Sequence, residues 1–264
     1  MIGRRRGFLV EPTVEVIDDV TEIRKRVQAG WYGTIAVDVM EYFKLADLGL
    51  IQPTFSALRG EGGNAPRYLL VVREDSGISS IEGLAGKTLS IQASTNANLG
   101  EAWLDSMLRE GRSVRPENFF RSREVVLKAS SAILPVFFGK ADAAIVDLGS
   151  FDVAREMNPQ LGAKLRVLRT SPEFAEALVC FTTRTSPFQD EILEAMRTLH
   201  LDPEGKQALL VFRFSRLVPV DNVALARARD LWQKHVLISH PSQRASSEVY
   251  GRSEDQPSRR GEKP

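Results

Sequence analysis

Short apolar strands and amphipathic helices alternate along most of this chain, and this alternation restricts the fold more than any other feature. Between Gly86 and Leu168, strand patterns such as KTLSI, REVVL and DAAIV are separated by helical patterns and short links. Alternation of this kind places strands in parallel sheets that helices cover on both faces. In open sheets of this type, ligands bind beyond the carboxyl ends of the strands. The sequence therefore predicts an α/β fold with mostly parallel sheets flanked by helices.

A pattern of glycine, a short apolar run, Val-Asp and an aromatic residue occurs twice. It covers residues 30–42, GWYGTIAVDVMEY, and residues 139–151, GKADAAIVDLGSF, so that Asp147 follows Asp38 by 109 positions (147 − 38 = 109). In each copy we expect a helix to end at the glycine and a buried strand to run to Val-Asp. The repeat indicates two lobes with equivalent strand ends facing across a cleft. The alternative is a chance likeness of two ordinary αβ units.

Composition excludes several classes of protein. The chain has 264 residues, of which 43% are hydrophobic, and its formal charge is +1, which gives no basic surface for nucleic acid. No apolar run approaches the ~20 residues of a membrane helix, so we expect no membrane span. Cys180 is the only cysteine and is expected to be a small buried strand residue. No His, Asp or Glu cluster has ligand spacing, so we expect neither metal nor cofactor.

The two ends of the chain differ from its middle. The start, MIGRRRGFLVEPTVEVIDDV, has the arginine pair of a twin-arginine export signal but not its apolar stretch, so we expect no signal peptide there. Val14 to Ile17 is predicted to be a short strand. Residues 241–264 are rich in serine and charge, and we expect a disordered tail because they cannot bury enough apolar surface.

Residues 73–111, REDSGISSIEGLAGKTLSIQASTNANLGEAWLDSMLREG, resemble the crossover into the second lobe of type 2 periplasmic solute-binding proteins, specifically the phosphate, phosphite and phosphonate binders of ABC transporters. FGKADAAIVD, LDPEGKQALL and RLVPVDN are similar to further motifs of that family, and the likeness covers residues 20–232. The resemblance implies a two-lobed fold in which the first βα unit of lobe 1 is missing. It divides the chain into lobe 1 (residues 1–75 and 180–240) and lobe 2 (residues 76–179), with hinges near Arg73 to Asp75 and Cys180 to Thr183.

The same resemblance implies a ligand site. In the family a Ser-Thr-Ser sequence at a helix start binds an oxyanion, and Ser94, Thr95 and Asn96 occupy those positions. A helix start offers unpaired N–H groups and a positive dipole end, although these residue types are also common N-caps. The resemblance also leaves open a ligand that carries an amine, because Glu176 lies near the position of a family Asp that receives the ammonium group of the substrate. The further ligand-binding candidates by position are Ser130, Ser131, Asp147, Asp38, Tyr42 and Glu176.

Each of these carboxylates has an alternative role. A strand-end aspartate commonly caps the following helix, and Glu176 could be a solvated side chain. His200, His235 and His240 lie away from the strand ends, and Cys180 has no nearby partner in the sequence, so we expect no catalytic residue.

The sequence thus predicts the solute-binding component of an ABC-type uptake system, which closes by hinge rotation on a phosphonate-, phosphite- or phosphate-like oxyanion. The expected partners are this small anion and an ABC transporter permease. The family implies a periplasmic or extracellular location, whereas the absence of a signal peptide implies a cytoplasmic one if the start is genuine. Two alternatives exist on the same fold. One is a small-molecule enzyme (a lyase or decarboxylase), and the other is a ligand-sensing module.

Overall fold

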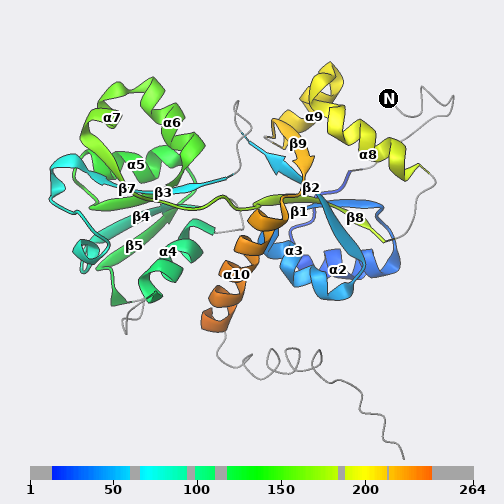
Figure 1. The fold of residues 1–264 in the computed structure, drawn as a ribbon, viewed down its shortest axis with the longest axis horizontal. Helices are drawn as coiled ribbons and strands as arrows, with labels where there is room; N and C mark the ends of the chain where they lie inside the picture. Colours follow the sequence, from blue (N-terminus) through cyan, green and yellow to red (C-terminus); the bar gives the residue numbers. More distant parts are fainter. Residues whose placement is uncertain are drawn as a thin grey trace, which may run out of the picture.

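Two lobes make up the computed structural model, which describes residues 14–59, 66–93, 99–110, 118–183, 188–212 and 214–239 (Figure 1). Lobe 1 contains a sheet with strand order β1-β8-β2-β9, and lobe 2 contains a sheet with strand order β5-β4-β6-β3-β7. Helices lie against both faces of each sheet (Figure 1). The predicted α/β, two-lobed fold is confirmed. The predicted disordered tail, residues 241–264, lies outside the described residues.

The elements of lobe 1 lie within residues 20–58 and 177–239, and those of lobe 2 lie within residues 68–170. The elements of lobe 1 are α2 (Val20–Ala29), β1 (Thr34–Asp38), α3 (Val39–Leu45), the 3-10 turn Ala46–Leu48, β2 (Ile51–Leu58), β8 (Ala177–Thr182), α8 (Gln189–Thr198), the 3-10 turn Leu199–Leu201, α9 (Pro203–Val211), β9 (Arg216–Pro219) and α10 (Asn222–Ser239). Those of lobe 2 are β3 (Tyr68–Arg73), the 3-10 turns Glu74–Ser76 and Glu82–Leu84, β4 (Thr88–Gln92), α4 (Leu99–Arg109), β5 (Ser122–Val126), α5 (Ala129–Phe137), β6 (Ala143–Asp147), α6 (Leu148–Met157), α7 (Pro159–Lys164) and β7 (Leu165–Thr170).

Strand direction differs from the prediction. Parallel pairing holds for β4 with β5 and for β4 with β6, whereas β3 and β8 run antiparallel to their neighbours, and β2 is antiparallel to β9. The reason is the path of the chain: β3 and β8 each begin at a crossing between the lobes, beside the carboxyl ends of β6 and β1. A strand that enters a sheet at that edge must run opposite to the strands that end there.

The expected lobe boundary at residue 75 is wrong, because β3 pairs with β6 and β7 and so belongs to lobe 2. The crossings lie between β2 and β3 (residues 59–67) and between β7 and β8 (residues 171–176). The hinge expected near Cys180 to Thr183 is wrong as well, because Cys180 lies within β8 and is fully buried. Burial raises the pKa of its thiol to about 12, as fits the core residue that we predicted.

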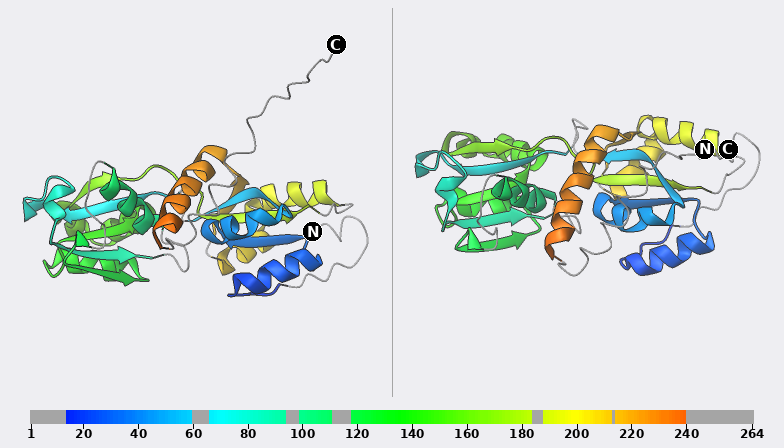
Figure 2. Two further views of the ribbon diagram at one scale, coloured as in Figure 1. Left: turned by 90° about the horizontal axis from the view of Figure 1, so that it is seen from below. Right: turned by 60° about the horizontal axis from the view of Figure 1, so that its bottom comes forward.

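The C-terminal helix α10 lies between the lobes in each view (Figures 1 and 2). Its Leu225, Ala228 and Leu231 belong to a core cluster that continues from Phe43 of α3 into Leu104 of α4. Two further clusters fill the spaces under α5, α6 and α7 and under α8 and α9. The two lobes therefore share one continuous apolar core along the face that α10 covers.

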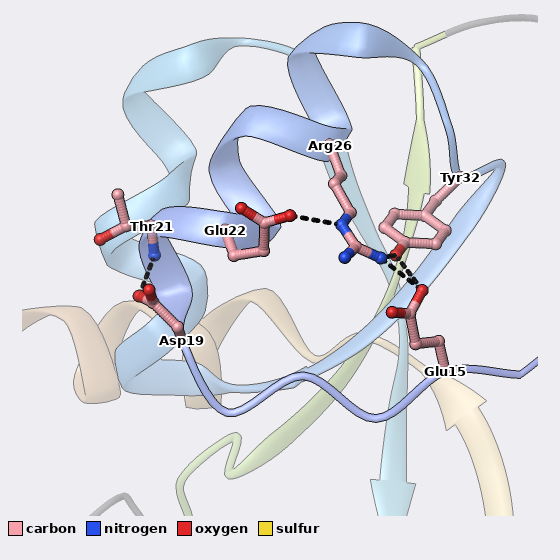
Figure 3. A network of polar contacts seen from close by, with 6 residues as sticks. All are labelled: Glu15, Asp19, Thr21, Glu22, Arg26 and Tyr32. Carbon is pink, nitrogen blue, oxygen red and sulfur yellow. Dashed lines mark hydrogen bonds and ion pairs between the residues drawn. The ribbon is translucent and has the colours of Figure 1, made fainter.

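The strand predicted at Val14 to Ile17 is absent: residues 14–19 have no regular secondary structure, and the side chains of Val14 and Val16 are 76% and 81% exposed. Polar contacts hold this segment instead (Figure 3). Arg26 of α2 contacts Glu15 and donates to Tyr32 Oη at 3.0 Å, and Tyr32 Oη donates to Glu15 Oε2 at 3.0 Å. These bonds lower the pKa of Glu15, so the contact is that of an ionised carboxylate.

Candidate ligand site where the strands of the two lobes end

The doubled sequence pattern is repeated in the structure. Gly30 and Gly139 both end a helical segment in the left-handed backbone region, each with φ of 71°. Asp38 ends β1 and Asp147 ends β6, and each caps the next helix: Asp38 Oδ1 accepts the Glu41 amide at 2.8 Å, and Asp147 Oδ1 accepts the Ser150 amide at 2.8 Å. Both aspartates thus cap helices, which is the role that the sequence analysis gave as the alternative to ligand binding.

In lobe 1 the end of β1 lies directly against the second crossing. Asp38 pairs with Ala177, the residue after Glu176, and the amide of Val39 donates to the carbonyl oxygen of Glu176 at 2.7 Å. Burial raises the pKa of Asp38 above its ordinary value, although hydrogen bonds from the backbone of Glu41 and Met40 oppose that shift. Two half-buried carboxylates, Asp38 and Glu176, therefore stand at this strand end.

In lobe 2 the ends of β4 and β6 are joined by side chains. Gln92, the last residue of β4, donates from Nε2 to Asp147 Oδ2 at 2.8 Å, and its Oε1 accepts the Asp147 amide at 3.2 Å. Asp147 also pairs with Tyr68, the first residue of β3. The carboxyl ends of the parallel strands and the start of β3 thus form one edge of the sheet, where an α/β fold binds its ligands.

Tyr68 connects the two lobes. Its backbone pairs with Asp147 in lobe 2, and its Oη lies 3.5 Å from Glu176 Oε1, at the entry to lobe 1. The ring is 4% exposed and packs on the first turn of α4, where a Cβ on Gly100 would lie 2.9 Å from Tyr68 Cδ1. The sequence analysis did not single out Tyr68 or Gln92. Their positions, first in β3 and last in β4, are the signal that could have indicated them.

The other candidates are spread over the molecule. Tyr42 is buried in the core, where burial raises the pKa of its phenol. Ser130 and Ser131 lie exposed in the first turn of α5 and line an open pocket of about 260 Å³ with Leu134, Pro135, Phe138 and Lys140. Ser94, Thr95 and Asn96 lie outside the described residues, between Ala93 and α4. The structure thus brings Asp38 and Glu176 together and places Asp147 beside Tyr68.

A second pocket, of about 80 Å³, lies at the crossings. It is lined by Pro66, Phe174, Ala175 and Glu176 of the crossings and by residues of β2, β9 and the start of α10: Ser56, Ala57, Leu58, Val218, Pro219, Asp221 and Ala224. A small space therefore lies beside Glu176, between the crossings and lobe 1.

Two classes of site are absent from the part of the chain that the structure describes. No group of three or more His, Cys, Asp or Glu side chains there is arranged to hold a metal ion. None of the described helices combines the length and the hydropathy of a membrane span.

The chain is similar to known binding proteins. The family model for the periplasmic substrate-binding protein of phosphonate ABC transporters matches residues 7–225. Among solved structures, XAC2383 from Xanthomonas citri bound to ATP is 20% identical, with 87% of this chain and 86% of that chain covered and a TM-score of 0.61. PhnD1 from Prochlorococcus marinus in complex with methylphosphonate is 13% identical, with 90% of each chain covered and a TM-score of 0.57.

A binding protein component of an ABC phosphonate transporter from Pseudomonas aeruginosa, PA3383, is 16% identical, with 95% of this chain and 84% of that chain covered and a TM-score of 0.56. At these identities the solved structures show a shared fold. Among curated proteins, no match was found.

Proposed function

Because the chain belongs to the family of periplasmic substrate-binding proteins of phosphonate ABC transporters, we propose that it binds a small phosphorus oxyanion where the strand ends of its two lobes meet. The family is one of transporter binding proteins, so the role of the chain is solute binding. The oxyanion, the residues that contact it and the closing motion are our proposal.

One observation carries this proposal: strand ends from both sheets reach the same two crossings. Asp38 lies beside Glu176 at the second crossing, and Tyr68, which begins β3 beside Asp147, reaches Glu176 with its hydroxyl. A ligand held there touches both lobes, so its binding free energy favours the closed arrangement.

The anion contacts come from lobe 2 in this proposal. Ser94, Thr95 and Asn96 supply hydroxyl, amide and backbone donors immediately before α4, and the helix dipole of α4 adds a positive end. Ser130 and Ser131 stand in the first turn of α5, the helix that follows β5 in the same lobe, and supply further hydroxyl donors. Tyr42 acts through packing, because it is buried in the core.

The carboxylates have a different role. Asp38 and Asp147 are occupied as helix caps, and they line the two walls without donating to an anion. Glu176 is suited to a cationic group on the ligand, since a carboxylate accepts hydrogen bonds from an ammonium group. We therefore propose that an aminoalkylphosphonate binds more tightly than a simple alkylphosphonate.

Closure takes place at the two crossings, which lie side by side. The Phe174 amide donates to the Pro66 carbonyl oxygen at 3.1 Å, and the Ser171 amide donates to the Tyr68 carbonyl oxygen at 2.8 Å. Two hydrogen-bonded connections of this kind allow rotation of one lobe against the other without separating them. The partner for the closed form is an ABC transporter permease, and the location is the periplasm or cell exterior, as the family implies.

Calorimetry of the full chain tests this proposal. Phosphate, phosphite, methylphosphonate and an aminoalkylphosphonate are titrated beside acetate and methanesulfonate as controls. We expect a phosphorus oxyanion to bind best, Thr95→Val to weaken it by about 1–3 kcal/mol through the lost donor, and Glu176→Gln to weaken only the amine-bearing ligand. Binding of none of these anions, or equal binding by the parent and Thr95→Val, would contradict the proposed site.

A further inference from the structure

The C-terminal helix α10 is attached to lobe 1 and to the second crossing. It follows β9 of the lobe 1 sheet, and the amide of Ala175, in the second crossing, donates to the carbonyl oxygen of Ala224 at 3.3 Å. Farther along the helix, the ring of Trp232 packs on that of Phe43 of α3, with 5.5 Å between the ring centroids. The guanidinium carbon of Arg229 lies 5.7 Å from the centre of the same Phe43 ring. Because of these contacts, α10 moves with lobe 1.

The same helix also lies against α4 of lobe 2, so that Figure 1 shows α10 between α4 and α3. Its Leu231 is buried in the apolar cluster that includes Leu104 of α4. One turn farther, Lys234 Nζ donates to Ser106 Oγ at 3.5 Å and lies 3.7 Å from Glu110 Oε1, directly after the end of α4. These contacts form a third connection between the lobes, in addition to the two crossings.

The apolar side chains carry most of this connection. Leu231 and Leu104 are removed from water, whereas the side chains of Lys234 and Glu110 are 55% and 70% exposed, so that solvent screens their attraction. Charges as exposed as these can be exchanged without disturbing the core. The charged pair is therefore a place where the contact between α10 and α4 can be weakened without unfolding the protein.

Rotation at the crossings changes the contact between α10 and α4. The crossings are backbone connections at residues 59–67 and 171–176, and they can twist in place. Helix α4 lies to one side of them, beside α10, so it is displaced when lobe 2 turns (Figure 1). The side chains of packed helices interdigitate and have only a few stable arrangements. When lobe 2 rotates, α4 must therefore slide along α10 or separate from it.

We propose that α10 is a strap: it is fixed to lobe 1, it holds lobe 2 through α4 in the arrangement of the structure, and it sets how far the lobes rotate against each other. The strap goes beyond the proposed ligand, because the protein has it before any ligand binds. A ligand that rotates the lobes must favour the new arrangement by more than the free energy that the strap contact loses.

A distance between the lobes, measured without ligand and at low salt, tests the strap. Spin labels are attached to two introduced cysteines, Met157→Cys on α6 and Leu210→Cys on α9, because both native side chains are exposed. Cys180 is the only native cysteine, and its full burial keeps it from competing for the label. Double electron-electron resonance gives the distribution of distances between the lobes. We expect one peak in the parent, and several peaks of similar weight would contradict the strap.

Exchange of the exposed charges weakens and then restores the contact. Lys234→Glu places a second carboxylate beside Glu110, and their repulsion should raise the population at other distances about two- to fivefold. Adding Glu110→Lys restores opposite charges in reversed positions and should return the distribution of the parent. Lys206→Glu on α9 is the matched control: it makes the same change of charge at an exposed position away from α4 and should have no effect.

Truncation of the apolar contact gives a second test. Leu231→Ala should change the distance distribution more than Lys234→Glu does, because the apolar side chains carry most of the contact. If α10 only stabilises the fold, Leu231→Ala lowers the melting temperature and leaves the distribution as in the parent. If Leu231→Ala does not fold, the charge variants decide alone, because their side chains lie at the surface.

Three results overturn the inference. They are a distribution in Lys234→Glu equal to that of the parent, an equal shift in Lys206→Glu, and failure of Glu110→Lys to restore the parent distribution in the double variant. The ligand titrations described under the proposed function are independent of these measurements. Binding of no phosphorus oxyanion would contradict the proposed function and leave the strap in place, so the two proposals fail separately.

Discussion

Gln92 and Asp147 hydrogen-bond to each other in both directions, and so lock the ends of β4 and β6 together. Gln92 precedes Ala93 and the proposed anion-binding residues, and Asp147 caps α6. The reciprocal pair uses the amide donor and the amide acceptor of Gln92 at once. It therefore fixes the edge of the lobe 2 sheet on which the proposed ligand site depends.

Gln92→Glu should make stability depend on pH. The substitution places a second carboxylate within hydrogen-bonding distance of Asp147, and at pH 7 their repulsion should cost about 1–3 kcal/mol of unfolding free energy. Protonation of one carboxylate relieves the repulsion, so the loss should shrink toward pH 4. Gln92→Met is the control, because it loses the hydrogen bonds without adding charge, so its loss of stability should be smaller at pH 7 and should change less with pH than that of Gln92→Glu. Urea unfolding between pH 4 and 8 separates these outcomes.

Gly100→Ala should destabilise lobe 2 by about 1–3 kcal/mol, because the added methyl group overlaps Ile145 and Tyr68 and the neighbours have little room to move. Gly162→Ala in α7 is the matched control: its Cβ would lie 3.6 Å from Arg155 Nε, an ordinary contact, and alanine favours the helix. We expect that variant to be as stable as the parent or slightly more so. Thermal unfolding of both variants measures the difference, and equal effects would contradict the close approach.

The stability of the Asp38→Asn variant should increase relative to that of the parent as the pH increases. The folded-state pKa of Asp38 is raised by burial, so its protonated form stabilises the fold below its unfolded-state pKa, and this contribution is lost as pH rises through the folded pKa. Asparagine retains the capping oxygen and has no charge to bury. The stability of Asp38→Asn minus that of the parent should therefore increase between pH 4 and 7.

Asp142→Asn is the control, because the pKa of Asp142 is shifted in the opposite direction. Burial alone would raise the pKa of Asp142, but hydrogen bonds from the amide and hydroxyl of Thr88, with the nearby charges of Lys87 and Arg121, lower it overall. The parent's advantage over Asp142→Asn should be present above the unfolded-state pKa and vanish as pH falls through the folded one. The same trend with pH in both variants would be inconsistent with these assignments.

Ser171→Ala should cost about 1–3 kcal/mol, because the hydroxyl of Ser171 accepts the buried Tyr68 amide at 2.8 Å and alanine leaves that N–H without this acceptor. Ser215→Ala provides the comparison. Ser215 Oγ donates to the Leu58 carbonyl oxygen at 3.2 Å, but the Ser215 amide already donates to that oxygen at 2.8 Å. We expect a change within about 0.5 kcal/mol there. Urea unfolding decides, and a larger loss in Ser215→Ala would refute the ranking.

The amino-acid sequence by itself determined the secondary-structure elements and the likeness of the two lobes. Gly30 and Gly139 stop helices, Val-Asp ends a strand and begins a helix, and the buried strands are apolar runs, because backbone sterics, capping and side-chain burial act over a few residues. The same local patterns carried the resemblance to the family.

Tertiary structure alone decided which sheet each strand joins and in which direction. The pairing of Tyr68 with Asp147 and of Asp38 with Ala177 joins residues far apart in the chain, and it placed β3 in lobe 2 and made β8 antiparallel to β1. Val14 and Val16 have a strand-like pattern, yet they face solvent and belong to no sheet of the described structure. Local preference is not sufficient in such cases, because a strand also needs a neighbour's backbone at the correct register, and the path of the whole chain determines that neighbour.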